Sequence, residues 1–467
     1  MSWQPVIGLE IHVQLKTRTK LFCGDATEFG SDPNTNVCPV CLGLPGALPV
    51  LNGAAVVLAV RAALGLSCSI HQESVFARKN YFYPDLPKGY QITQFDRPIA
   101  TDGSLQGVKI RRIHMEEDAG KLLHDRLAMR TAIDLNRAGV PLIEIVTEPD
   151  IHSAADARAF LNRLKQLLQY LDVSDCDMEK GSLRVDANVS LRREGTIPLG
   201  TKTEVKNMNS FSNTERALEF EIARQRSILE TGGVIEQQTL LWDAVNSQAR
   251  PMRSKEESHD YRYFPDPDLP PLVISMAEIE RIRGELPELP TAKAARFIAS
   301  YQLPEYDVDV LIADSAIADY FEATARHSGD AKTASNWIMT TVLSSLNTRG
   351  IGIHELGVTA AALGELIQLV SRGTVSATAA RRVFGEMQNG GKSAPQVIEE
   401  LGLAQVSDDD QIKRWASEVT REHADVVARY RAGDAKLFGF LMGELMKKSR
   451  GKADPRRANE VMRAVLA

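Results

Sequence analysis

The sequence has no long hydrophobic run and only five cysteines. Its longest apolar stretch near the N-terminus, GAAVVLAV, ends at Arg61 after eight residues, which is too short to cross a membrane. No basic segment followed by an apolar core begins the chain, so we expect a cytoplasmic protein with no membrane partner. Five is an odd number of cysteines, which favours metal ligands or buried thiols over a disulfide framework.

The sequence also lacks the short glycine-rich motifs of common nucleotide-binding and hydrolase folds. It contains no G-x-x-x-x-G-K-[ST], G-x-G-x-x-G or G-x-S-x-G pattern, so any ATP would bind on a sheet face rather than in a P-loop. The formal net charge of −6 argues against a protein that coats nucleic acid indiscriminately. A local basic patch nevertheless occurs near the C-terminus, at Lys447, Lys448, Arg450, Lys452, Arg456 and Arg457.

The pattern of the chain changes near residue 290. With 467 residues the chain is too long for one compact core, so we expect two or three domains. Before residue 290, short alternating segments are separated by Pro, Gly and Asn, with helices such as residues 153–171 between them. This half is typical of an α+β fold with a largely antiparallel sheet. The remainder is alanine-rich and is predicted to be all-helical.

Several predicted strands carry polar side chains on one face. In VIGLEIHVQL, Glu10 and His12 alternate with apolar residues, and Asp186 and Asn188 do so in SLRVDANVSLR. Glu144 lies in the apolar run PLIEIV, where an unpaired carboxylate would cost several kcal/mol, so we expect a cation or a metal opposite it. A sheet that is solvated on one side shows the same alternation. Because several strands share it, we predict a concave polar face.

Carboxylates and one imidazole on separate strands suit Mg²⁺, which prefers oxygen ligands and bridges to a substrate phosphate. The segment RIHMEEDAGK adds Glu116 and Glu117 as further candidates. An acidic turn before a glycine explains this segment equally well. A phosphate-handling site on the sheet face is one reading of this pattern, and a structural role is the other.

The cysteines form a second constellation. Cys38 and Cys41 make a C-x₂-C pair, and Cys23 lies fifteen residues before Cys38. Three thiolates are one ligand short of a closed zinc site, and the carboxylate of Asp25 can supply the fourth ligand. The alternative is a set of reduced thiols packed in the core.

Longer stretches occur in order across about the first 290 residues: VIGLEIHVQL, PNTNVCPVCLGLPGALPVLN, RKNYFYPDLPKGYQI, HMEEDAGK, DLNRAGVPLIEIVTEPD, GSLRVDANVSLR, EVKNMNS and DYRYFPDPDLPPL. Together they closely resemble the B-subunit family of the bacterial GatCAB aspartyl/glutamyl-tRNA amidotransferases. The resemblance implies a catalytic cradle domain with an antiparallel sheet, related to the glutamine synthetase and guanidino kinase class, over residues 1–292. It further implies a helical domain over residues 293–360 and a helical, tRNA-binding tail domain over residues 361–467.

The activity implied by the resemblance is that of a ligase. Members of the family phosphorylate the side-chain carboxylate of Glu-tRNA(Gln) or Asp-tRNA(Asn) with ATP, and ammonia then displaces the phosphate to give Gln-tRNA(Gln) or Asn-tRNA(Asn). The activation is necessary because oxide is a very poor leaving group. The implied partners are an A subunit, which hydrolyses glutamine to supply ammonia, and a small C subunit, so that the complex is a heterotrimer that binds tRNA.

The resemblance also implies roles for single residues. Glu10, His12, Glu117 and Glu144 match the residues that bind Mg²⁺ and act in catalysis. Lys79 is implied to contact substrate or phosphate, with Asp186 and Asn188 on the same ATP-binding face. Zinc-bearing members carry a second cysteine two residues after the first, where this sequence has Asp25; zinc held by Cys23, Cys38 and Cys41 is therefore an additional expectation.

Two other functions remain open at this stage. The chain could be a non-catalytic tRNA-binding scaffold whose acidic cluster is a structural ion site. It could instead be a free-standing metal-dependent phosphohydrolase, although this reading leaves the basic patch between Lys447 and Arg457, which is expected to contact the tRNA body, without a purpose.

Overall fold

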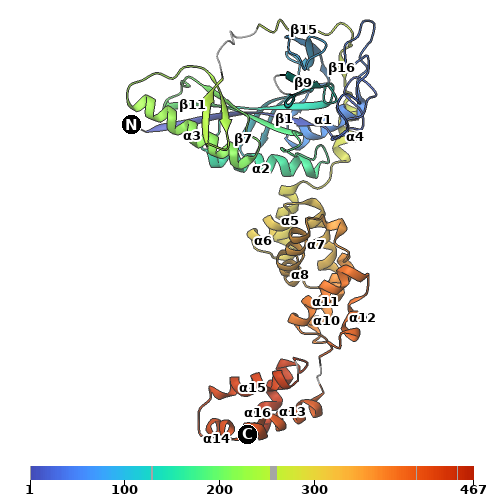
Figure 1. Cartoon of the computed structure of the whole chain (residues 1–467), viewed down its shortest axis with the longest axis vertical. Coiled ribbons are helices and arrows are strands. Elements are labelled where there is room, and N and C mark those ends of the chain that lie inside the picture. Colours follow the sequence, from blue (N-terminus) through green and yellow to red (C-terminus); the bar gives the residue numbers. More distant parts are fainter. Residues whose placement is uncertain (1, 128–129, 253–259, 406–407, 450) are drawn as a thin grey trace. The chain divides into compact units, whose positions relative to one another are not determined.

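The computed structural model describes residues 2–127, 130–252, 260–405, 408–449 and 451–467. The chain divides into two compact units, Met1–Pro290 and Thr291–Ala467 (Figure 1). The described strands lie in the first unit, and the second unit is built from helices. The predicted α+β class with an all-helical C-terminal part is therefore confirmed. No described helix is both long enough and apolar enough to span a membrane.

The strands are short except for those at the centre of the main sheet. In chain order they are β1 (Trp3–Gln14), β2 (Ser69–Ile70), β3 (Glu73–Ser74), β4 (Phe76–Asn80), β5 (Tyr90–Gln94), β6 (Ala100–Leu105), β7 (Val108–Glu117), β8 (Lys121–Leu127), β9 (Arg130–Asp134), β10 (Pro141–Thr147), β11 (Leu183–Arg193), β12 (Thr203–Lys206), β13 (Thr239–Asp243), β14 (Gln248–Pro251), β15 (Phe264–Pro265) and β16 (Leu272–Val273).

Four helices lie within the first unit: α1 (Gly53–Gly65), α2 (Ala154–Tyr170), α3 (Phe211–Glu230) and α4 (Met276–Gly284). The second unit contains α5 (Pro290–Tyr301), α6 (Glu305–Leu311), α7 (Ser315–Ser328), α8 (Ala331–Trp337), the π-helical η1 (Ile338–Val342), α9 (Leu343–Arg349), the 3₁₀ turn η2 (Ile353–Glu355), α10 (Ala360–Ser371), α11 (Ala377–Gly390), α12 (Ala394–Glu400), α13 (Asp409–Glu422), α14 (Ala424–Arg431), α15 (Leu437–Lys448) and α16 (Pro455–Leu466).

The main sheet of the first unit places β1 at its centre. Its described strand order is β14-β13-β12-β11-β1-β10-β7-β6-β2. Both neighbours of β1 pair with it in antiparallel fashion, and the parallel pair within this sheet is β12 with β13. β11 pairs with β1 from Trp3 to Val13 and β10 pairs with it from Glu10 to Gln14, so the register of β1 fixes which of its side chains face the core.

One face of this sheet packs on helices. Ile7, Leu9, Ile11 and Val13 of β1 are at most 1% exposed and share a core with α1, α2 and α3. Helix α2 begins at Ala154 because the side chain of Ser153 accepts a hydrogen bond from the backbone N–H of Asp156 at 3.0 Å. Figure 1 shows α2 and α3 along the same side of the sheet.

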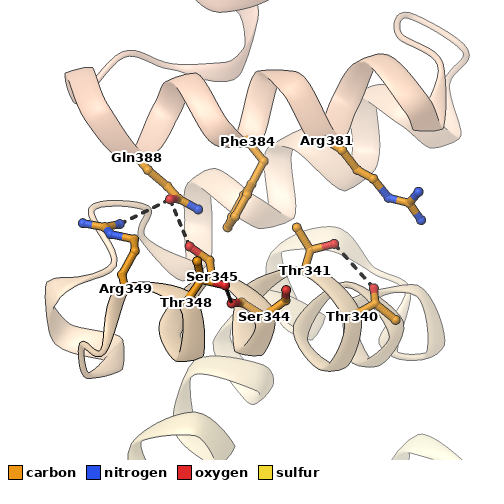
Figure 2. Close-up of a pocket in the computed structure, with 9 residues that line it drawn as sticks. All are labelled: Thr340, Thr341, Ser344, Ser345, Thr348, Arg349, Arg381, Phe384 and Gln388. Carbon is orange, nitrogen blue, oxygen red and sulfur yellow. Dashed lines mark hydrogen bonds between the residues drawn. The ribbon is translucent and has the colours of Figure 1, made fainter.

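The helical unit contains two further hydrophobic cores. One is formed by residues between Phe297 and Ile398, and the other by residues between Ile412 and Leu466. In the first of these, α11 runs beside the continuous helix made by η1 and α9 (Figure 2). The domain boundaries expected at 292/293 and 360/361 stay predictions, and the core that begins at Phe297 includes residues on both sides of position 360.

Candidate active site and cysteine cluster

The polar residues of β1 lie on the sheet face opposite to the helix-covered core. In the register of β1 with β10, His12 lies opposite Glu144, and with β11, Glu10 lies opposite Asp186. β7 places His114 opposite Glu144. Because directly paired residues project to the same side of a sheet, the structure gathers these side chains from four adjacent strands onto one face.

A compact group of one imidazole and two carboxylates occupies this face. The ligand atoms of His12, Glu116 and Glu144 all lie within 4.8 Å of one another. The Nε2 atom of His12 is 3.5 Å from Glu116 Oε1 and 3.6 Å from Glu144 Oε2. All three side chains are at least three-quarters buried, so their charges interact in an environment that screens them weakly.

A second imidazole balances the two carboxylates. His114 Nε2 is 3.0 Å from Glu144 Oε2 and 3.6 Å from Glu116 Oε2. Burial opposes protonation of His114, but Glu144 and Glu116 raise its pKa to about 9. In return, although burial favours the neutral acids, the two imidazoles hold the pKa of Glu116 and of Glu144 below the usual range. Both carboxylates are therefore ionised at neutral pH.

Glu10 lies two residues before His12 on β1, near carboxylates as well as a lysine. Its carboxylate accepts a hydrogen bond from Asn188 Nδ2 at 3.1 Å. Burial and the charges of Glu144, Glu204 and Asp186 raise the pKa of Glu10, whereas Lys206 opposes this shift. The ammonium group of Lys206 lies 3.0 Å from both Asp186 and Glu204. The structure thus brings Glu10, Asp186 and Asn188 onto the polar face, beside the group that contains His12 and Glu144.

Glu117 lies apart from this group. Consecutive side chains of a strand point to opposite faces, so Glu117 projects away from the side on which Glu116 lies. Its carboxylate forms an ion pair with Lys88 and accepts a hydrogen bond from the backbone N–H of Ile92 at 2.9 Å. The structure therefore brings Glu116, rather than Glu117, together with His12 and Glu144.

Lys79 of β4 lies near the polar face. Its ammonium is 4.7 Å from the ring centroid of Tyr261, and its charge contributes to the lowered pKa of Glu144. Among the described residues it makes no ion pair. A lysine with a free charge beside ionised carboxylates is suited to binding a phosphate group.

Sequence reasoning did not identify His114 or the ion pair of Arg184 with the buried Asp118. Arg184 Nη2 lies 2.9 Å from Asp118 Oδ1, and Gln14 Nε2 donates to Asp118 Oδ2 at 2.8 Å. The signal for His114 was present in RIHMEE, where His114 and Glu116 occupy alternate positions of one strand. Asp118 lies just after the end of β7, so the alternating pattern of the strand gave no indication of its role.

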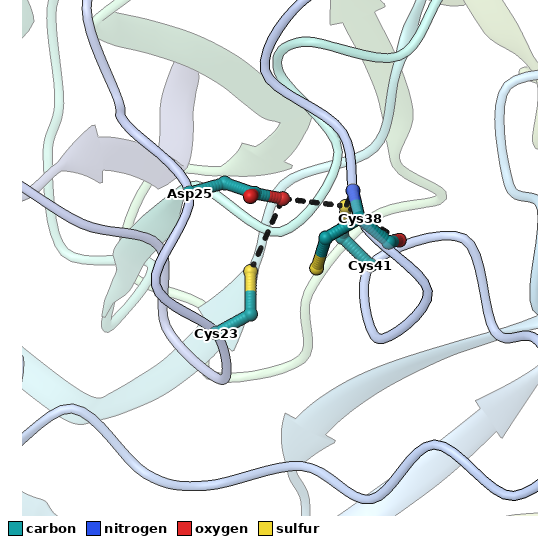
Figure 3. A group of neighbouring side chains, drawn as sticks. All are labelled: Cys23, Asp25, Cys38 and Cys41. Atoms are coloured by element: carbon teal, nitrogen blue, oxygen red, sulfur yellow. Dashed lines mark hydrogen bonds between the residues drawn. The ribbon is translucent and has the colours of Figure 1, made fainter.

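The cysteine cluster forms a closed set of four ligands. The Sγ atoms of Cys23, Cys38 and Cys41 and a carboxylate oxygen of Asp25 all lie within 4.8 Å of one another (Figure 3). Asp25 Oδ2 lies 3.2 Å from Cys41 Sγ and accepts a hydrogen bond from Cys23 Sγ at 3.6 Å. These cysteines come from two separate loops, and the structure gathers them as their spacing predicted.

The charge of this cluster is concentrated on one thiol. The hydrogen bond from Cys23 lowers the pKa of Cys41 to about 6; burial opposes this shift, and the charge of Lys20 supports it. Lys20 is fully buried, with Nζ 3.6 Å from Cys41 Sγ and 2.6 Å from the backbone oxygen of Asn36. A thiolate among further thiols and a carboxylate is the donor set of a structural zinc site.

The basic patch of the tail is partly neutralised within its own domain. Lys448 pairs with Glu418 at 3.1 Å and also with Glu422. Arg457 pairs with Asp409 and with Glu460, and Lys447 Nζ lies 3.5 Å from Glu444. Lys452 and Arg456 make no ion pair within the described part of the chain, and Arg450 lies outside it. The predicted contact of this patch with tRNA stays a prediction.

Comparisons with known proteins cover nearly the whole chain. A family model described as the GatB/GatE catalytic domain matches residues 5–280, and one described as the GatB domain matches residues 319–466. The B subunit of the aspartyl/glutamyl-tRNA(Asn/Gln) amidotransferase of Prosthecochloris aestuarii is 51% identical over 100% of this chain and 98% of the relative. The proteins of the same name from Persephonella marina and Chlorobium chlorochromatii are 50% and 52% identical, covering at least 99% of both chains.

The ion pair of Arg184 and Asp118 gives a stability prediction. Asp118 is 4% exposed; burial favours its neutral form, but Arg184 and Arg137 lower its pKa. Asp118→Asn removes the buried carboxylate that pairs with the partly exposed Arg184 and is expected to lower the free energy of unfolding at pH 7 by about 2 kcal/mol, measured by urea denaturation.

The sign of the pH dependence follows from the lowered pKa of Asp118. The ionised carboxylate stabilises the fold above the unfolded-state pKa of about 3.9 and loses this effect as the pH falls through the folded-state value. The difference between wild type and Asp118→Asn should therefore shrink below about pH 4. Asp172→Asn, at a side chain that is 70% exposed and paired with Lys16, is the matched control, with an expected change under about 1 kcal/mol. An equal loss of unfolding free energy in Asp118→Asn and Asp172→Asn would contradict a stabilising role of the Arg184–Asp118 ion pair.

Proposed function

Because the chain belongs to the family of the GatB/GatE catalytic domain, we propose that it is the B subunit of an aspartyl/glutamyl-tRNA(Asn/Gln) amidotransferase. The reaction is the ATP-dependent conversion of Glu-tRNA(Gln) or Asp-tRNA(Asn) into Gln-tRNA(Gln) or Asn-tRNA(Asn). The observation that carries the proposal is the polar sheet face, which lies inside the matched catalytic domain and gathers ionised carboxylates, imidazoles and a free lysine.

The proposed Mg²⁺ site uses the group around His12. Two ionised carboxylates and an imidazole nitrogen within 4.8 Å of one another would be suitable ligands for Mg²⁺, together with phosphate oxygens of the nucleotide. We assign His12, Glu116 and Glu144 to this site, with Glu10 beside them, in place of the set with Glu117. When bound, the metal would neutralise phosphate charge and align the nucleotide with the acceptor carboxylate.

The other residues of the face hold and orient the reacting groups. His114 fixes Glu144 through a 3.0 Å contact, as an outer partner does for a metal ligand. Lys79 is placed to bind the phosphoryl group, and Asn188 to bind nucleotide or ribose. The Nε atoms of Arg112 and Arg184 are buried without a hydrogen-bond partner among the described residues; a bound polar ligand would satisfy them.

Catalysis by such a face rests on positioning and charge. The substrate carboxylate attacks the terminal phosphorus of ATP, ADP leaves, and ammonia then attacks the acyl carbon so that phosphate leaves. Two anions, a carboxylate and ATP, must approach each other, so the cations of the face lower the barrier by offsetting their repulsion. We propose that the A subunit supplies the ammonia and that the C subunit completes the complex.

Zinc is a separate proposal for the cysteine cluster. Cys23, Cys38, Cys41 and Asp25 fit a four-coordinate site in number and in donor type. The ion would tie two loops together, and no chemical step is assigned to it. The carboxylate of Asp25 takes the place that a fourth thiolate has in zinc-bearing members of the family.

The first functional prediction concerns His12. In the complex assembled with the A and C subunits, His12→Ala should lower the formation of Gln-tRNA(Gln) from Glu-tRNA(Gln), ATP and ammonium chloride by about 100-fold, because a ligand of the phosphate-binding site is lost. Ammonium chloride bypasses glutamine hydrolysis, so the measurement reports on this chain. The affinity for tRNA should not change.

The matched control is His354→Ala, at an exposed position of η2 in the helical unit, which should retain full activity. Full activity of His12→Ala would leave the chain as a tRNA-binding scaffold with a structural ion site. Steady ATP hydrolysis by the wild type in the absence of aminoacyl-tRNA would favour the phosphohydrolase instead.

The zinc prediction is tested by metal content. Wild-type protein produced with zinc in the medium should contain about one zinc ion per chain, measured by plasma mass spectrometry, and Cys41→Ser should lose it. Cys176→Ser, at a buried cysteine outside the cluster, should retain it. Zinc-free wild type, or unchanged zinc content in Cys41→Ser, would contradict the proposal.

A further inference from the structure

Lys79 of the candidate active site lies over the rings of two tyrosines. Its Nζ atom is 4.7 Å from the ring centroid of Tyr261 and 5.8 Å from that of Tyr81. The centroids of these two rings are 6.0 Å apart, and the rings meet edge to face at 71°. An ammonium group within about 6 Å of a ring centroid is attracted to the negative face of the ring. The two tyrosines therefore hold the ammonium group of Lys79 without supplying a counter-charge.

The preceding residue of β4, Arg78, is held in a different way. Its guanidinium pairs with Asp266 and with Asp268, each at 2.8 Å. Carboxylates neutralise a cation, whereas an aromatic ring leaves the charge and the N–H donors of the cation for another partner. No ion pair of Lys79 occurs within the described part of the chain. Arg78 is thus tied into the fold, and Lys79 is held with its charge still available to a phosphate.

The segment that carries Tyr261 is anchored to the strand that carries Lys79. The backbone N–H of Asn80 donates to the backbone oxygen of Tyr261 at 3.0 Å, and Asn80 Nδ2 donates to that of Arg262 at 2.8 Å. Arg262 has a φ of 41°, in the left-handed region that is unfavourable for residues other than glycine. Just after this turn, β15 pairs with β4 in antiparallel fashion. These backbone contacts on β4 fix the ring of Tyr261 against Lys79.

The tyrosines around Lys79 lie close to the carboxylates of the polar face. Burial and the negative charge of Glu116 raise the pKa of Tyr81 and of Tyr263, and the charge of Lys79 contributes to the lowered pKa of Glu144. An ammonium group so near ionised carboxylates is attracted toward them. A direct pair would occupy the oxygens that are proposed to bind Mg²⁺. In the structure the ammonium lies over the tyrosine rings instead.

We propose that Tyr261 is the positioning residue that holds Lys79 ready to bind phosphate. This inference rests on the proposed function, in which Lys79 binds the transferred phosphoryl group. Tyr261 is assigned rather than Tyr81 because its ring is the closer of the two to the ammonium group. A long lysine side chain loses conformational freedom when it binds a ligand, and a ring that already holds it reduces this cost. The ring supplies the attraction, so phenylalanine at position 261 should retain the effect and leucine should not.

The test measures binding of a non-hydrolysable ATP analogue with Mg²⁺ to the complex assembled with the A and C subunits, by isothermal titration calorimetry. Tyr261→Leu should raise the dissociation constant by about 5-fold and Tyr261→Phe by less than about 2-fold, because only leucine lacks the ring. Phe264→Leu is the matched control, since it removes another ring of the same segment, one that lies 5.9 Å from the guanidinium of Arg78. Arg78 keeps both of its carboxylates, so this variant should change the dissociation constant by less than about 2-fold.

A double-mutant comparison separates positioning of Lys79 from a general effect on the fold. Lys79→Gln should weaken binding of the analogue by about 10-fold, and Tyr261→Leu should add nothing in that background, because the ring then has no ammonium to hold. Wild-type affinity in Tyr261→Leu, or an equal loss from Tyr261→Leu with and without Lys79, would overturn the inference and leave the proposed function intact. Unchanged affinity in Lys79→Gln would refute the phosphate-binding role of Lys79 and this inference with it. A wild-type complex that does not bind the analogue would refute the proposed function itself.

Discussion

The antiparallel register of β1 between β10 and β11 is the constraint on which the first unit depends. It places Ile11 and its apolar neighbours under the helices and, by the same alternation, Glu10 and His12 on the opposite face. A slip of one residue would move charged side chains into the core and apolar ones onto the polar face. The hydrophobic core therefore also sets the geometry of the proposed active site.

Collecting carboxylates on one buried face is unfavourable unless cations oppose them. On this face, nearby cations offset the negative charges: His114 pairs with Glu144, and Lys206 pairs with Asp186. Lys79 has no such partner among the described residues and remains available to a ligand.

Features with a local period were predictable from the sequence, and features that depend on long-range packing were not. The alternation in β1 and β11 predicted the fold class and the polar face. The alternation could not show whether Glu116 or Glu117 lies on the polar face. That depends on how β7 pairs with β10, which the sequence does not reveal. The cysteine spacing and the nearby Asp25 predicted the four possible ligands, but whether they meet depends on how two loops pack against each other. The pairing of Lys448 with Glu418 and Glu422 of α13 arises from helix packing, for which no local pattern exists.

The central claim is that the polar face transfers phosphate to the side-chain carboxylate of an aminoacyl-tRNA. The most direct measurement uses Glu-tRNA(Gln) labelled with oxygen-18 in that carboxylate, incubated with the complete complex, ATP, Mg²⁺ and ammonium chloride. The released inorganic phosphate is then analysed by mass spectrometry. An acyl phosphate intermediate predicts that one labelled oxygen passes to each phosphate, because the leaving phosphate keeps the bridging oxygen. Unlabelled phosphate released together with amidated tRNA would contradict the account.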